Sequence, residues 1–91
     1  MIKLYTTQTC YYCTRAKNYL DTLKIPYETL DINKDKDSFD FFIKSGHRSV
    51  PQIYVGSYLL CEGGSDGLVK MTKDQIHNKV LELTSKKIIS T

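Results

Sequence analysis

Two cysteines three positions apart, Cys10 and Cys13, have the most distinctive chemistry in this 91-residue chain. They follow an apolar run, residues 1–5, and open a segment in which apolar residues recur at helical spacing. A thiol at the start of a helix lies beside unpaired backbone N–H groups and the positive end of the helix dipole, which both favour the thiolate. Because the thiolate is the form that attacks a disulfide, this placement predicts a redox-active pair.

The two thiols are expected to differ in exposure. Cys10 falls at the helix start and should be partly exposed, whereas Cys13 shares a helix face with Ala16 and Leu20, which we expect to pack inward. One accessible thiol and one shielded thiol suit a two-step exchange. In that exchange Cys10 attacks a disulfide, and Cys13 then displaces the product to leave a Cys10–Cys13 disulfide.

Half of a zinc site is the alternative use of such a pair. A structural zinc site needs about four ligands. The other candidates, Cys61, His47 and His77, are scattered and form no second CxxC or HxxxH spacing. The sequence therefore favours redox chemistry, and we expect no metal. Cys61 lies in an apolar segment and is interpreted as a small buried residue.

Composition limits the remaining function classes. The length suits one domain, residues 1–91, and the chain is 41% hydrophobic and 25% charged, as in ordinary globular proteins. A net charge of +3 suits an anionic small molecule but is too small for a nucleic-acid partner. Met1 leads directly into the apolar run and no stretch is long enough to span a membrane, so we expect a cytoplasmic protein.

Periodicity and turn residues predict the order strand, helix, strand, helix, strand, strand, helix. A strand–helix–strand start implies a parallel pair with a right-handed crossover, and the later hairpin adds antiparallel strands. The prediction is a thioredoxin-like α/β fold, with a mixed four-stranded sheet and helices on both faces. The strands are expected at 2–5, 27–32, 51–55 and 58–61, and the first helix at 11–24.

The later helices are less regular. Phe39, Phe42 and Ile43 form the apolar stripe expected of the second helix. Ser65 is expected to cap the helical turn that follows, and residues 72–75 (TKDQ) have the form of a capping box, so the last helical segment can begin afresh there. Residues 84–91 either fray or dock.

Three motifs together resemble the glutaredoxins, over most of the chain. Residues 9–17 (TCYYCTRAK) are similar to the family's TCPYCxRAK, residues 45–53 (SGHRSVPQI) to SGxxTVPQI, and residues 63–68 (GGSDGL) to GGxDDL. The resemblance implies a glutathione-dependent thiol–disulfide oxidoreductase, with Cys10 as nucleophile and Cys13 as resolving thiol. Glutathione would be a cosubstrate, and no cofactor would be tightly bound. Carried over by position, the glutathione site falls on Cys10, Tyr12, Val50, Pro51, Gly64, Ser65 and Asp66.

The same resemblance implies partners. The partners would be glutathione and disulfide-containing client proteins, with ribonucleotide reductase as a usual family client. We expect a monomer that binds neither nucleic acid nor membrane.

Two segments of that site have a purely structural interpretation as well. Pro51 is tolerated at the first position of a strand, but a cis Val50–Pro51 bond would turn the Val50 backbone toward the cysteines and an extended substrate. Gly64, Ser65 and Asp66 can be a turn and a helix start. Alternatively, they can bind the carboxylate and the ammonium of an amino-acid head group such as the γ-glutamyl end of glutathione.

The chain departs from the family pattern at four places. Tyr11 replaces the proline of the CxxC motif, and Thr7 stands where many members carry the Lys or Arg that holds the glycine carboxylate of glutathione. Lys44 or Arg48 would then supply that charge. The hairpin over residues 55–64 is about two residues longer than we expect. Gly67 replaces an acidic residue, which leaves Asp66 alone to meet the ammonium.

These departures keep two alternatives open. One is a redoxin of similar fold that thioredoxin reductase reduces, which would need no site for an amino-acid head group. The other is a binding module in which Cys10 and glutathione hold an iron–sulfur cluster across a dimer.

Overall fold

Four strands form one mixed sheet in the order β2-β1-β3-β4 in the computed structural model, which describes residues 2–89 and the side chains of residues 2–85. β1 is parallel to β2, and the pairs β1–β3 and β3–β4 are antiparallel. The predicted thioredoxin-like architecture is confirmed. The strands are β1 (Ile2–Thr6), β2 (Tyr27–Asp31), β3 (Gln52–Val55) and β4 (Tyr58–Leu59).

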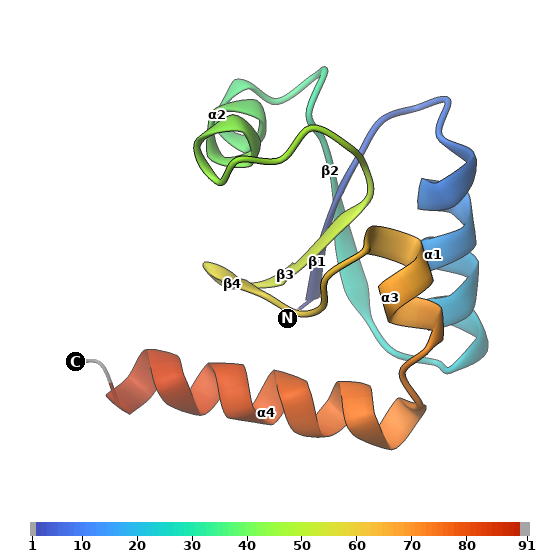
Figure 1. Cartoon of the computed structure of the whole chain (residues 1–91), viewed down its shortest axis with the longest axis vertical. Helices are drawn as coiled ribbons and strands as arrows, with labels where there is room; N and C mark the ends of the chain where they lie inside the picture. Colours follow the sequence, from blue (N-terminus) through green and yellow to red (C-terminus); the bar gives the residue numbers. More distant parts are fainter. Residues whose placement is uncertain (1, 90–91) are drawn as a thin grey trace.

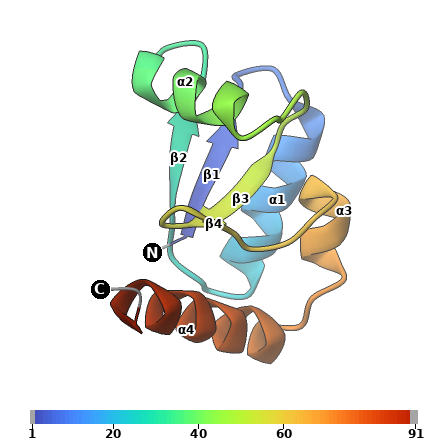
Figure 2. The same cartoon turned by 60° about the vertical axis from the view of Figure 1, so that its left-hand side comes forward.

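Helices cover both faces of this sheet, as predicted (Figures 1 and 2). On one face lies the larger apolar core, which includes Ala16 of α1, Leu68 of α3 and Ile76 of α4. On the other face, Phe42 of α2 packs with Tyr5 and Tyr54 of the sheet. The helices are α1 (Tyr11–Thr22), α2 (Lys36–Lys44), α3 (Gly64–Val69) and α4 (Lys73–Ile89).

Helix α1 carries the predicted inward stripe, since Cys13, Ala16 and Leu20 are buried. It ends two residues earlier than the periodicity predicts. Lys24 adopts a left-handed backbone with φ 59°, which reverses the chain before the Pro26 that cannot continue a helix.

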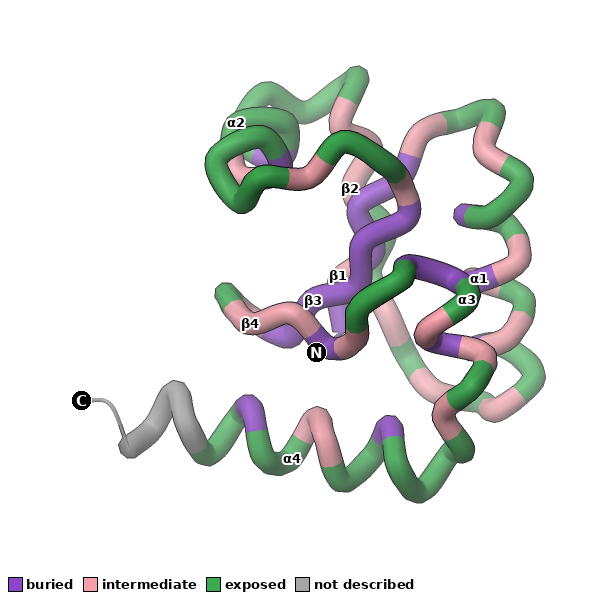
Figure 3. The backbone as a smooth tube through the Cα atoms, in the orientation of Figure 1, coloured by how far each residue is buried: buried purple, intermediate pink, exposed green. Residues whose placement is uncertain are grey.

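The apolar stripe predicted for the second helix is only partly buried in α2. Only Phe42 of the predicted stripe is buried, whereas Phe39 and Ile43 are 42% and 50% exposed. Figure 3 shows the same contrast, with buried positions concentrated on β1 and β3 and most of α2 exposed. Of the three predicted stripe residues, α2 therefore packs only Phe42 fully against the sheet.

The last helical segment is divided into α3 and α4, so the element order gains one helix over the predicted order. The capping box at the start of α4 is confirmed. The Thr72 N–H donates to Gln75 Oε1 at 2.9 Å, and the Gln75 N–H donates to Thr72 Oγ1 at 3.2 Å. The predicted Ser65 cap is wrong, because Gly63 occupies the N-cap of α3 with φ 86° and Ser65 lies buried in the first turn.

The C-terminal end of the chain is helical through Ile89 of α4, and residues 90–91 of the predicted tail lie outside the described residues. None of the helices among residues 2–89 is both long enough and apolar enough to cross a membrane.

Candidate active site

The Cys10 sulfur lies at the N-terminus of α1, where it caps the helix. Cys10 is the N-cap residue with an extended backbone, and its Sγ accepts a hydrogen bond from the Cys13 N–H at 3.1 Å. The same thiol can donate to the Val50 carbonyl oxygen, 3.7 Å away. Cys10 is partly exposed. The Cys10 sulfur therefore lies beside a backbone donor and at the positive end of the helix dipole.

Cys13 has a different environment one turn into the same helix. Its side chain is 1% exposed. Burial, together with the neighbouring Cys10 side chain, raises the pKa of Cys13 to about 12, although a backbone contact from Thr7 acts in the opposite direction. Cys13 is therefore a protonated, shielded thiol at neutral pH. The predicted contrast in burial between the two cysteines is confirmed.

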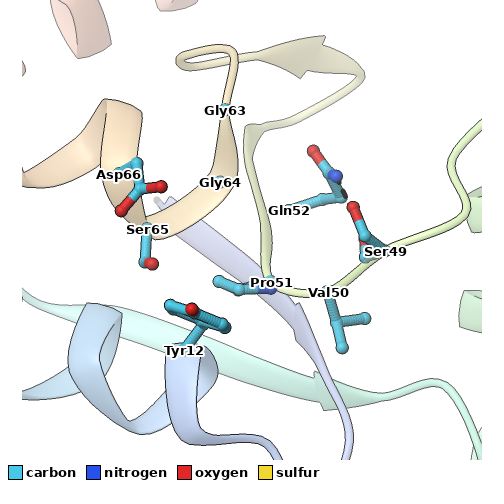
Figure 4. Close-up of a pocket in the computed structure, with 9 residues that line it drawn as sticks. All are labelled: Tyr12, Ser49, Val50, Pro51, Gln52, Gly63, Gly64, Ser65 and Asp66. Atoms are coloured by element: carbon cyan, nitrogen blue, oxygen red, sulfur yellow. Dashed lines mark hydrogen bonds between the residues drawn. The ribbon is translucent and has the colours of Figure 1, made fainter.

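A cavity of about 310 Å³ opens between the start of α1, the loop before β3 and the start of α3. Figure 4 shows Tyr12 on one side of it, Pro51 and Val50 on the second, and Ser65 and Asp66 on the third. The predicted residues other than the two cysteines thus surround one space. Its lining is Tyr12, Ser49, Val50, Pro51, Gln52, Gly63, Gly64, Ser65 and Asp66.

The start of α3 packs directly against the loop that carries Pro51. The Val50–Pro51 peptide bond is cis, as the resemblance implies. Gly64 has φ 58°, and a Cβ at this position would lie 2.8 Å from the Pro51 carbonyl oxygen. Only glycine fits there, because any side chain would push α3 away from the cavity.

The surroundings of Gly67 explain why this chain has no acidic residue at that position. A Cβ at this position would lie 1.8 Å from the Glu62 carbonyl oxygen, in the segment that returns from β4 to α3. The acidic residue that the family carries here is therefore excluded by the path of this chain's own hairpin. Among the described residues, Asp66 is the one carboxylate that lines the cavity.

Asp66 is already paired with a cation. Its Oδ1 lies 2.6 Å from Nη1 of Arg15, so that an ion pair joins α3 to α1 at the rim of the cavity. The sequence places Arg15 near the site but gives no sign of this contact, because the partners are 51 residues apart. Lys44 and Arg48, the predicted substitutes for a basic residue at Thr7, are exposed and are not among the described residues that line the cavity.

Two further contacts organise the loop before Pro51. The Gln52 side-chain amide donates to the Ser49 carbonyl at 3.0 Å. His47 Nε2 lies 2.6 Å from the Tyr54 hydroxyl, and burial lowers the pKa of His47. His47, which the sequence suggests is a plain loop residue, therefore ties this loop to β3.

The remaining cysteine and the metal candidates do not join the site. Cys61 is partly buried, and burial raises its pKa to about 11. Among the side chains that the structure describes, no three of the types His, Cys, Asp and Glu come together to hold a metal ion.

Comparison with known proteins decides the family. The glutaredoxin family model matches residues 2–59. The chain belongs to the glutaredoxin family. It is 35% identical to Glutaredoxin 1 of Rickettsia felis over 89 residues, which cover 94% of this chain and 85% of that protein. It is also 35% identical to Glutaredoxin 3 of Escherichia coli strain K12 over 68 residues, or 74% of this chain and 80% of that protein.

A solved structure supports the fold assignment. The crystal structure of a buckwheat glutaredoxin–glutathione complex superposes with a TM-score of 0.69 at 23% identity, over 89% of this chain and 76% of that one. Membership of the glutaredoxin family makes this chain a thiol–disulfide oxidoreductase. Glutaredoxins use glutathione as a cosubstrate.

Proposed function

We propose that this glutaredoxin reduces protein disulfides and glutathione mixed disulfides with electrons from glutathione, through the Cys10/Cys13 pair. The observation that carries the proposal is the position of the Cys10 sulfur. It caps α1 and lies 3.7 Å from the Val50 carbonyl, and Val50 itself lines the cavity. A ligand held there would have its sulfur next to the attacking thiol.

Glutathione fits the chemistry of the cavity lining. Tyr12 and Pro51 supply apolar walls on either side of the peptide, and the Val50 backbone supplies groups that can pair with its cysteinyl residue. The carboxylate of Asp66 can accept the ammonium of the γ-glutamyl group. The proposed glutathione-binding residues are these four together with Gly64 and Ser65, which line the same cavity.

Two routes follow from the unequal thiols. On a glutathione mixed disulfide, the Cys10 thiolate attacks the glutathione sulfur, the client leaves as a thiolate, and glutathione stays on Cys10. A second glutathione then reduces this adduct and leaves as glutathione disulfide. On a protein disulfide, Cys10 forms a mixed disulfide with the client, and Cys13 displaces it to form a Cys10–Cys13 disulfide. Two glutathione molecules restore the dithiol.

The proposed partners are glutathione and disulfide-containing clients, with ribonucleotide reductase as a client to test. We also propose that the enzyme acts as a monomer. We propose that the protein acts in the cytoplasm, because glutathione keeps thiols reduced there.

A coupled assay tests the proposal. The substrate is a small glutathione mixed disulfide, supplied with glutathione, glutathione reductase and its nicotinamide cofactor, and the proteins are wild type, Cys10→Ser and Cys13→Ser. We expect Cys10→Ser to lose all turnover, and Cys13→Ser to retain at least a tenth of it because the first route needs only Cys10. If the wild type shows no turnover here but is reduced by thioredoxin reductase, the chain is a redoxin of the alternative class.

A further inference from the structure

A second cavity, which we call the α2 cavity, lies between the sheet, the first half of α2 and the β3–β4 turn at Gly56 and Ser57. Its volume is about 390 Å³, and it shares no lining residue with the cavity of the candidate active site. Figures 1 and 2 show α2 on the opposite side of the sheet from α1. The α2 cavity is therefore a separate space that the thiol chemistry does not use.

The Tyr5 hydroxyl is an unused polar group in this cavity. Tyr5 is 6% exposed, and no hydrogen bond joins its hydroxyl to any of the described residues. No fully buried side-chain oxygen or nitrogen in the described part of the chain lacks a partner, so the Tyr5 oxygen keeps access to the cavity. Burial, followed by the neighbouring Tyr54 and Asp35, raises the pKa of Tyr5, which therefore stays a neutral hydroxyl. A polar group buried to this extent normally has a partner, which a ligand in the cavity would supply.

Two carboxylates at the start of α2 line the same cavity. Asp35 is the N-cap of α2, and the buried Ser38 hydroxyl donates to its Oδ2, which orients the carboxylate. Neither Asp35 nor Asp37 forms an ion pair with a described residue. Lys3 is the one cation among the described lining residues, and it lies opposite Glu28 in the register of β1 and β2. The charge around the cavity is thus net negative, in a chain with a net charge of +3, and it favours a cationic ligand.

The arrangement suits a planar cation with several donors better than an ammonium ion. Phe41 is half-buried in the cavity lining and stacks on Tyr5, with ring centroids 5.4 Å apart. A guanidinium can stack on such an aromatic surface while its N–H groups point outward in its plane, whereas an ammonium is a compact and strongly hydrated charge. We propose that the α2 cavity binds a guanidinium group, which donates hydrogen bonds to the Asp35 carboxylate and the Tyr5 hydroxyl oxygen and stacks on Phe41.

This site adds a recognition function to thiol–disulfide exchange and does not depend on the proposed use of glutathione. The guanidinium group belongs either to a free compound or to an arginine of a partner protein. An arginine bound here does not occupy the active-site cavity, because the two cavities share no lining residue.

An NMR titration of the isotopically labelled full-length protein with N-acetyl-arginine methylamide tests the site. The amide signals of the first turn of α2 and of Gly56 and Ser57 should shift and reach saturation. Two matched compounds should bind at least about tenfold more weakly, because each loses a charge-assisted hydrogen bond or the stacked plane. They are the citrulline analogue, which has the same shape without the charge, and the lysine analogue, which carries an ammonium.

A blocked pentapeptide with one central arginine between alanines separates the two sources of the group. Tighter binding of this peptide than of the single-residue compound supports an arginine on a partner protein, since the flanking chain then adds contacts. Equal affinity supports a free guanidinium compound.

Three variants assign the contacts. Asp35→Asn keeps a residue that can begin the helix but removes the charge, so it should raise the dissociation constant of the arginine compound about tenfold. Tyr5→Phe should raise it about threefold without lowering the free energy of unfolding, because the hydroxyl has no protein partner to lose. Asp40→Asn is the control, since Asp40 is exposed on the same helix and lies outside the described lining. It should keep the wild-type dissociation constant.

Two results would overturn the guanidinium site. One is equal binding of the arginine, citrulline and lysine compounds, or an unchanged dissociation constant in Asp35→Asn. The other is a set of saturating shifts confined to Ser65 and Asp66, which would put the ligand in the active-site cavity instead. Cooperative urea unfolding of each variant shows that it is folded, whether or not the protein uses glutathione.

Discussion

The two cysteines of this glutaredoxin share one helix turn and one sequence motif, yet their surroundings give them different chemistry. Cys10 is partly exposed, and its sulfur accepts a hydrogen bond from the Cys13 N–H at 3.1 Å. Cys13 is buried, and its pKa is raised to about 12, so it stays protonated at neutral pH. Such a thiol is well suited to act second, when proximity within a mixed disulfide offsets its low thiolate fraction.

His47, in the loop before Pro51, makes the stability of the protein depend on pH. Burial lowers the pKa of His47 in the folded protein below its ordinary value of 6.5. A lowered folded-state pKa means that the unfolded chain binds the proton more readily. The contribution of His47 to stability is therefore complete above pH 6.5 and declines as the pH falls below that value.

We expect the free energy of unfolding in urea to fall between pH 7 and pH 5, and His47→Gln to show a smaller fall than wild type. His77→Gln is the matched control, because His77 is exposed on α4 and its loss should leave the pH dependence unchanged. An equal fall in wild type and His47→Gln would show that this histidine does not set the pH dependence.

At the scale of elements, the site depends on how closely α3 approaches its neighbours. Gly64 lies against Pro51, and Gly67 lies against Glu62, so the helix start is held on two sides by backbone contacts that admit no Cβ. The absence of an acidic residue at position 67 therefore has a structural cause. The return from β4 passes where a side chain at position 67 would stand.

Gly67→Asp, which restores the family residue, should destabilise the protein rather than strengthen ligand binding. A Cβ 1.8 Å from the Glu62 oxygen forces the backbone to move, at a cost of about 2–3 kcal/mol in the free energy of unfolding. Gly46→Ala is the control, because its Cβ would meet no atom within 4 Å. Its cost in the free energy of unfolding is only that of a non-glycine residue at φ 85°, about 1 kcal/mol. Equal losses in urea unfolding for both variants would contradict this account.

Much of the site was predictable because it is local in the sequence. The Cys10–Cys13 helix turn and the Thr72–Gln75 capping box each depend on residues three positions apart. The contacts that the sequence did not indicate join different elements. Arg15 of α1 meets Asp66 of α3, 51 residues away, and His47 of the loop before Pro51 meets Tyr54 of β3, seven residues away. The Ser65 cap failed for a backbone reason, because Gly63 can adopt the positive φ that starts the helix earlier.

For the whole molecule, the family match ends at residue 59, before α3 and α4 begin. α3 nevertheless supplies one wall of the cavity, and α4 completes the larger core on the same face of the sheet as α1. Ile76 and Leu83 of α4 are almost fully buried there. The C-terminal helix is thus part of the domain that holds the site in place.

Ile76→Ala should lower the free energy of unfolding by about 2–4 kcal/mol, because a fully buried side chain leaves a cavity in the core. Leu81→Ala, five residues further along α4 and 54% exposed, should change it by less than about 0.5 kcal/mol. Urea unfolding of both variants measures the difference. Similar small losses would mean that α4 does not pack on this core in solution.

The most direct test of the assigned chemistry is to trap the first intermediate. Cys13→Ser is mixed with a glutathione mixed disulfide, quenched with acid, and analysed by intact mass and by peptide mapping. The account predicts one glutathione per chain, attached to Cys10 within the peptide that spans residues 4–15. Glutathione on Cys61 instead, or a folded protein that forms no adduct, would contradict the assignment of Cys10 as the nucleophile.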